Sequence, residues 1–324
     1  MSATTLTARP AWRRAWRGVS LALRVGIPAA VFALVWRELV SLDWPAVWAA
    51  VMTSDRVLIV GAMGAAALAV AVMGLYDVLA FRDIGRLTGL KRWGLGSMLF
   101  AWTNFLTLGP LGGPAARLII YRKAGASTGS VVVGLTRLYI GMLSGLAGWL
   151  IAVVAPITLE FDSIPARAGI AVISAIASAM VAGRLLALIP PGRVDLGPAR
   201  SALLGLVGTL DWGGVLAVFV LTGAAAGNGV SQVEQARAMY LGHLAGMLSM
   251  IPGGLGSADA VWLKTLTLDG ASAETTAAQI MLFRVIYYIL PWMIAALALN
   301  IIFAEQWKRL LAERMRQRRS EVAP

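Results

Sequence analysis

Long apolar segments alternate with short polar ones along the chain, and this pattern predicts membrane-spanning helices. Six runs approach the roughly 20 apolar residues that a helix needs to cross the hydrocarbon core of a bilayer; they cover residues 19–42, 57–81, 131–157, 169–189, 202–222 and 277–303. A helix satisfies its backbone hydrogen bonds internally, as the membrane interior requires. We therefore predict an all-α polytopic membrane bundle of about six spans.

Two further apolar segments are interrupted, at "GPLGGPAAR" (109–117) and at "IPGGLGSAD" (251–259). Proline removes a helix hydrogen bond and glycine relaxes the backbone, so each interruption predicts a broken helix. The residues that form these breaks are Pro110, Gly112, Gly113, Pro252, Gly253, Gly254 and Gly256. Close packing between helices is the alternative explanation for the glycines. It does not require the prolines, which favours the broken-helix interpretation.

Composition and charge agree with a membrane location. The chain has 324 residues, of which 59% are hydrophobic and 14% charged, and its formal net charge is +12. The basic residues cluster beside the ends of apolar runs, at 9–17, 82–92 and 308–319, so they indicate membrane orientation rather than nucleic-acid binding. We expect a basic interfacial segment (1–18), one transmembrane domain (19–305) and a basic tail (306–324), with both termini on the cytoplasmic side of a bacterial inner membrane.

The same charge rule bears on the interrupted segments. If residues 93–121 crossed the membrane, Arg122 and Lys123 would lie outside; if the segment dips in and returns, both stay cytoplasmic. A second dip over 236–268, entering from outside, leaves Asp269 and Glu274 external. The charges favour two oppositely directed re-entrant segments, although a full crossing of 93–121 remains the alternative.

The two interrupted segments also resemble each other. Arg117 and Asp259 each lie seven residues after the first proline of their segment, and both segments later reach Gly-Ala-Ser. This similarity predicts an inverted repeat with halves at about 57–157 and 202–303, an architecture of transporters that hold substrate at the membrane midplane. Chance similarity between glycine-rich segments is the alternative.

Ionisable residues at membrane depth are costly and usually mark a pathway or an internal pair. We expect Arg117, Arg137 and Arg284 to grip a phosphate, with Asp259 balancing charge or meeting a cationic headgroup. A structural pair between Arg117 and Asp259 is the alternative. The remaining candidates for contact with the substrate are Tyr139, Tyr287 and Asn104.

Three other polar residues carry weaker expectations. Asp77 is expected near the inner end of its span, solvated and unremarkable, whereas Asp211 either faces the bundle or sits nearer the membrane edge. The single histidine, His243, is expected to be a hydrogen-bonded structural residue. Because the chain has no cysteine and no hydrolase, P-loop or zinc-protease motif, we expect no metal, no cofactor and no enzymatic activity.

Four stretches carry a resemblance to a known family: "YDVLAFRDIGRL", "NFLTLGPLGGPAARLIIYRKAG", "IPGGLGSADAVW" and "FRVIYYILPW". Over roughly residues 20–305 they resemble the transmembrane flippase-like domain of bacterial lysylphosphatidylglycerol synthases. The resemblance implies movement of lipid between leaflets, with two re-entrant elements around a central cavity. The soluble synthase domain of that family has no counterpart here, so lipid synthesis is not implied.

The predicted function is therefore a flippase-like lipid translocase that moves a phosphate-bearing amphiphile between leaflets. An integral-membrane lipid-modifying enzyme that uses Asp259 or Asp211 as acid and base is one alternative, and a secondary transporter of a small solute is another. The expected partner is a membrane phospholipid or other envelope lipid. The sequence leaves the oligomeric state open, a homo-oligomer included.

Overall fold

The computed structural model describes residues 40–84, 86–106, 112–154, 164–188, 196–249 and 251–301. Within these ranges the chain is helical and contains no strand. The elements are α2 (Trp44–Met52), α3 (Arg56–Ala80), α4 (Gly89–Leu106), α5 (Gly112–Lys123), α6 (Thr128–Val154), α7 (Ile164–Ala187), α8 (Gly197–Ala225), α9 (Gln232–Ser249), η2 (Pro252–Gly254), α10 (Ser257–Leu268), α11 (Ala273–Phe283) and η3 (Arg284–Ile289).

The described helices confirm the predicted all-α membrane bundle. Five of them are long and apolar enough to cross a membrane: Arg56–Ala80, Thr128–Val153, Gly169–Ala187, Gly197–Ala225 and Ala273–Ile301. These correspond to five of the six predicted runs. The remaining run, 19–42, lies almost entirely outside the described residues, as do the basic segment 1–18 and the tail 306–324.

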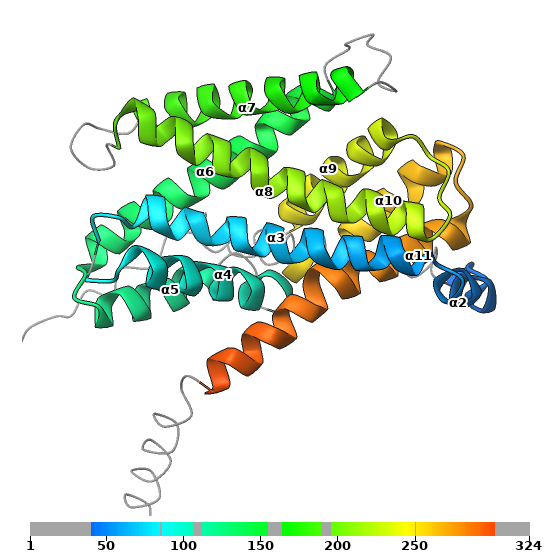
Figure 1. Ribbon diagram of the computed structural model, residues 1–324, viewed down its shortest axis with the longest axis horizontal. Helices are drawn as coiled ribbons and strands as arrows, with labels where there is room; N and C mark the ends of the chain where they lie inside the picture. The colour runs from blue at the N-terminus through cyan, green and yellow to red at the C-terminus, as the bar shows by residue number, and fades with distance from the viewer. Residues whose placement is uncertain are drawn as a thin grey trace, which may run out of the picture.

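Helices α3 and α8 lie side by side at the centre of the bundle and run in opposite directions (Figure 1). The amide of Asp55, which precedes α3, donates to the carbonyl of Ala225 at the end of α8 (3.0 Å). Small side chains let the two backbones approach, since a Cβ added to Gly214 would lie 2.9 Å from that of Ala69. The hydrophobic effect does not drive helices together inside lipid, so close van der Waals packing of this kind stabilises their association instead.

Two pairs of shorter helices enter this bundle from opposite ends (Figure 1). In the first pair α4 has 18 residues and α5 has 12; in the second α9 has 18 and α10 has 12. The first pair returns to the end at which it starts, because the amide of Arg86 donates to the carbonyl of Ala124 (3.1 Å). The second pair starts and finishes beside the C-terminal end of α8, because Asp269 after α10 lies within the electrostatic reach of Glu234 at the start of α9.

The helix breaks fall where the proline and glycine residues predict them. Helix α9 ends at Ser249, and α10 begins at Ser257 after a short turn. Within that turn Gly253, Gly254 and Gly256 have φ angles of +63°, +61° and +81°, which glycine adopts without strain. In the first pair the chain leaves α4 at Leu106 and resumes at Gly112; Pro110 lies outside the described residues.

The tips of the two pairs meet inside the bundle. A Cβ added to Gly253 would lie 3.3 Å from the carbonyl oxygen of Phe105 and 3.6 Å from that of Asn104, both in the last turn of α4. The ring of Phe105 also contacts Trp292 edge-on, with centroids 5.9 Å apart. Two segments far apart in the sequence therefore form one central junction.

Candidate functional site

A cavity of about 380 Å³ occupies the region where the two broken helix pairs meet. Residues that line it come from α3, α4, α5, α6, α8, α9, α10, η2 and η3. The cavity therefore lies at the centre of the fold, rather than between two adjacent helices. Most of the lining is apolar, with Met73, Met142, Leu143, Trp212 and Val215 among the contributors. A small number of polar groups in an apolar pocket is typical of a ligand-binding site.

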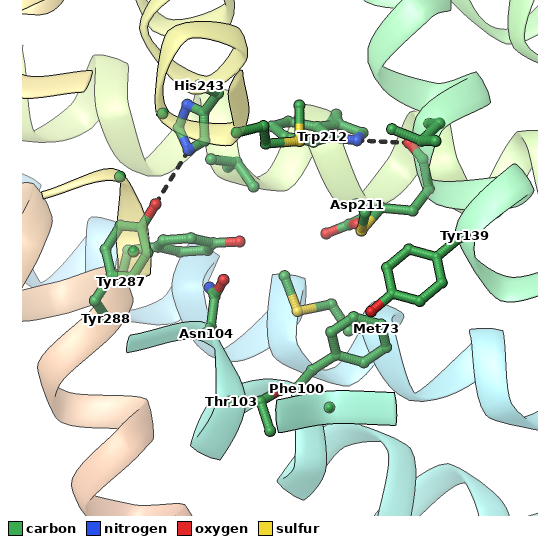
Figure 2. Close-up of a pocket in the computed structure, with 18 of the residues that line it drawn as sticks. Met73, Phe100, Thr103, Asn104, Tyr139, Asp211, Trp212, His243, Tyr287 and Tyr288 are labelled. Carbon is green, nitrogen blue, oxygen red and sulfur yellow. Dashed lines mark hydrogen bonds between the residues drawn. The ribbon is translucent and has the colours of Figure 1, made fainter. Parts of the chain in front are cut away.

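The predicted site residues divide into two groups. Those that line the cavity are Asn104, Arg117, Tyr139, Tyr287, Gly113, Gly253 and Gly254. Arg137, Arg284, Asp259 and Gly256 do not line it. Figure 2 shows Asn104, Tyr139 and Tyr287 directed into the same space from three different elements.

Arg117 is bound to a carboxylate that was not expected to be its partner. Its Nε donates to both carboxylate oxygens of Asp77 (3.1 Å each), and its Nη2 donates to Oδ2 (2.7 Å). The hydroxyl of Tyr121 donates to Asp77 Oδ1 (3.1 Å). The guanidinium also lies over the ring of Phe100, 4.5 Å from its centroid. Arg117 is thereby held rigidly at the cavity wall.

The expectation of a solvated Asp77 is wrong. Asp77 is completely buried, because α4 and α5 fold back over the end of α3. Gly96 of α4 packs directly against it, since a Cβ there would lie 2.7 Å from a carboxylate oxygen. A helix end that looks exposed in the sequence becomes interior when another element covers it.

Asp259 and Arg284 form a second ion pair, called the clamp, at the break between α9 and α10. Arg284 Nε donates to Asp259 Oδ1 (2.9 Å), Nη1 donates to the carbonyl of Gly253 (2.6 Å), and Nη2 to that of Gly254 (3.3 Å). Asp259 Oδ2 accepts from the amide of Gly256 (2.8 Å). The clamp therefore satisfies the backbone groups that the break leaves unpaired.

This clamp also excludes the predicted alternative of an Arg117–Asp259 pair. Each residue is instead paired within its own half of the described chain, Arg117 with Asp77 and Asp259 with Arg284. Arg284 reaches Asp259 from a π-helical turn, Arg284–Ile289, which also orients Tyr287 and Tyr288. Such turns inside α-helices occur frequently at functional sites.

Arg137 lies toward the end of the bundle where α3 finishes. Its Nη1 donates to the carbonyl of Ala80 and to Asp83 Oδ2, at 3.3 Å in both cases. Asp83 also pairs with Arg200 at the start of α8 (3.4 Å). This position is at the cytoplasmic edge in the predicted topology, away from the central cavity.

Asp211, His243 and Tyr288 line the cavity but were not among the predicted binding residues. His243 Nδ1 contacts the carbonyl oxygen of Met239 (2.9 Å), and its Nε2 is 3.3 Å from the hydroxyl of Tyr288 (Figure 2). The predicted hydrogen-bonded role of His243 is thus confirmed. Its placement in the cavity wall could not be read from a lone histidine in an apolar segment.

Asp211 faces the bundle rather than its edge, which settles the position that the sequence left open. It is 3% exposed, and its Oδ2 accepts from the hydroxyl of Tyr76 (3.0 Å). Figure 2 shows its carboxylate directed into the cavity. Its place midway along a long apolar span was the signal that could have identified it.

The fold and the cavity define a polytopic α-helical membrane protein with a central cavity. No family model matches the chain. The chain is 24% identical over 284 residues to Inner membrane protein YbhN of Escherichia coli (strain K12), a match that covers 84% of this chain and 88% of that protein. The similarity supports a membrane location. Among the described residues, no group of three or more histidine, aspartate or glutamate side chains could hold a metal ion.

Proposed function

We propose that the protein is a lipid translocase that moves a phosphate-bearing amphiphile between the leaflets of the inner membrane without altering it chemically. The observation that carries this proposal is the position of the cavity, at the junction of two broken helix pairs that enter from opposite ends. Broken helices that meet at mid-depth are how transporters expose polar backbone to a substrate.

The helix order supports an inverted repeat as the basis of this function. Helices α3 to α6 have 25, 18, 12 and 27 residues, and the second run has 29 in α8, 18 in α9, 12 in α10 and 29 in the span 273–301. The two short pairs open at opposite ends of the bundle. We infer that the two halves are copies of one unit with opposite orientation, each with a re-entrant pair.

The distribution of charge supports an orientation. The end of the bundle where α3 finishes, called the basic end, carries Arg82, Arg86, Lys91, Arg122 and Lys123. The opposite end carries Asp55, Glu234, Asp269 and Glu274, and fewer basic residues. Under the positive-inside rule the basic end faces the cytoplasm.

The chemistry of the lining favours an amphiphile over a small polar solute. Leu143 lines the cavity and is 44% exposed near the middle of α6, which supports an opening toward the lipid at mid-depth. Arg117 is the arginine in the described lining, and its Nη1 makes no hydrogen bond to a described residue. We assign it the phosphate contact, whereas Arg137 and Arg284 hold the scaffold.

The proposal is tested by reconstituting the purified chain in vesicles that contain fluorescently labelled phosphatidylglycerol or phosphatidylethanolamine. Wild-type protein should accelerate loss of the protected signal when a membrane-impermeant quencher is added. Leu143→Trp should slow this movement by obstructing the opening, whereas Val172→Trp, on the 57% exposed outer face of α7, should not.

Two results would contradict the proposal. One is the absence of any acceleration with either lipid when the protein is folded and correctly inserted. The other is the appearance of a chemically altered lipid, which thin-layer chromatography of the same vesicles would detect and which would favour the enzymatic alternative.

A further inference from the structure

One oxygen of Asp211 has no hydrogen-bond partner among the residues that the structure describes. The residue lies midway along α8 and is 3% exposed. Its Oδ2 accepts from Tyr76, but its Oδ1 is buried and makes no hydrogen bond to any described residue. No described lysine, arginine or histidine lies within 4.0 Å of the carboxylate. The carboxylate faces the cavity (Figure 2).

The other buried carboxylate near the cavity shows how this fold compensates such a charge. Asp77 receives two nitrogen donors from Arg117 and a hydroxyl donor from Tyr121. From the described residues, Asp211 receives one hydroxyl donor. A carboxylate at membrane depth without a cation is costly, so such residues in membrane proteins commonly bind an ion or carry a proton.

The groups that face Asp211 do not supply the missing charge. Tyr76 of α3 donates a hydrogen bond to the carboxylate, and Tyr240 of α9 and Tyr287 of η3 lie within its electrostatic reach. The described cation-forming groups in the lining, Arg117 and His243, do not contact Asp211, since Arg117 pairs with Asp77 and His243 contacts Met239 and Tyr288. Arg184 of α7 and Glu274 of α11 lie in terminal turns, away from mid-depth.

A metal cation fits this position poorly. Hard cations take six to eight oxygen ligands, roughly, and Tyr76 is the oxygen-bearing group bonded to the carboxylate. Apolar side chains that cannot serve as ligands to a hard cation, among them Met73, Leu138 and Met142, also line the cavity. A proton needs one lone pair, which Oδ1 provides.

We propose that Asp211 is the coupling-proton site of the protein. A proton from water in the cavity binds Oδ1 and converts the carboxylate to the carboxylic acid, while the Tyr76 hydroxyl stays bonded to Oδ2. When the headgroup of the lipid passes, the carboxylic acid releases the proton to water on the side of the membrane opposite the one from which it entered, so a proton gradient drives lipid movement in one direction. The binding of the proton stands on the geometry alone; its coupling to transport rests on the proposed function.

The binding step is tested on the full chain in lipid nanodiscs, by infrared difference spectroscopy during a change of pH. Wild-type protein should show the carbonyl stretch of a carboxylic acid that appears as pH falls, and Asp211→Asn should lose this band. The control Asp269→Asn, at an exposed position beyond α10, should retain it. Tyr76→Phe should shift the frequency of the band, because the carbonyl of the protonated carboxyl group loses its hydrogen bond. An unchanged band in Asp211→Asn overturns the assignment.

The coupling step is tested in the labelled-lipid vesicles with and without an imposed pH gradient. Wild-type movement should be several-fold faster in one gradient direction, and the ratio of the two rates should fall to unity in Asp211→Asn. Wild-type movement that ignores the gradient overturns the coupling but leaves the proposed function intact. The other outcome is that Asp211→Asn keeps the gradient response and loses movement of phosphatidylethanolamine alone. That result overturns the coupling role of Asp211 and makes it a docking site for a cationic headgroup.

If neither lipid moves while the infrared band behaves as expected, the proton site stands and the proposed function fails. The two proposals are therefore separable by experiment.

Discussion

The pairs Arg117–Asp77 and Arg200–Asp83 represent two very different environments for an ion pair. In the first, both side chains are almost completely buried, at 3% and 0% exposure; in the second the exposures are 37% and 48%. Removing one partner of a buried pair leaves an uncompensated charge, whereas water and salt screen an exposed pair. The cost of a single substitution should therefore differ strongly between them.

Replacement of Arg117 by alanine should destabilise the protein by about 3–5 kcal/mol, because it strands the Asp77 carboxylate in the interior. Arg200→Ala should cost at most about 1 kcal/mol. Thermal unfolding in detergent micelles, followed by intrinsic tryptophan fluorescence, measures both. The double variant Asp77→Asn with Arg117→Gln should recover part of the loss, since it buries no charge. Equal melting temperatures for Arg117→Ala and Arg200→Ala would contradict the importance of this pair.

At the scale of elements, the two broken helices depend on each other. The turn at η2 is held by Arg284 from a later helix and lies against the last turn of α4. Gly253 combines a positive φ angle with this contact, so no side chain fits there without displacement. The junction between η2 and α4, which lines the cavity, is therefore sensitive to the addition of a single methyl group at Gly253.

Gly253→Ala should destabilise the protein by about 1–2 kcal/mol through backbone strain, and should slow lipid movement by shifting α4 away from the break. The matched control is Gly229→Ala, because Gly229 has no atom within 4 Å of an added Cβ and no positive φ angle. Melting temperature and the vesicle assay report the two effects separately. Wild-type stability and rate in Gly253→Ala would refute the role given to this contact.

At the scale of the whole molecule, the proposed orientation places the openings of the two helix pairs on opposite sides of the membrane. Ser127 follows α5 at the basic end, and Ser272 precedes α11 at the other end. Both residues are exposed, and each hydroxyl accepts a hydrogen bond from the amide three residues later. A substitution at either position therefore removes a similar N-terminal cap from the helix that follows.

The chain contains no cysteine, so single cysteines report position without a background. Ser272→Cys should react with a membrane-impermeant maleimide in intact cells, and Ser127→Cys should react only after permeabilisation. Complete protection of either residue in both conditions would indicate a misfolded variant, which the melting temperature identifies. Labelling of both from the same side would contradict the inverted orientation.

The fold class and the positions of the two helix breaks were predictable because both depend on local sequence. Apolar runs of spanning length have few alternatives in a membrane, and prolines with clustered glycines interrupt a helix wherever they fall. Most of the predicted cavity-lining residues flank these breaks, which explains why Asn104, Arg117 and Gly253 were found.

The partners of the charged residues were not predictable from the sequence. Asp77 pairs with Arg117 across 40 residues of chain, and Asp211 meets Tyr76 across 135. Such pairs depend on which helices pack against each other, and the spacing of residues along one helix does not determine this packing.

The sequence by itself therefore determined that this is a membrane bundle with two broken segments, since hydropathy and helix breaking act over neighbouring residues. Only the tertiary structure decided which charges are compensated. It joined Arg117 to Asp77 and Arg284 to Asp259, and left one buried oxygen of Asp211 without a hydrogen bond to any described residue. The physical reason is that the energy of a buried charge depends on groups brought together by packing, from helices that are distant along the chain.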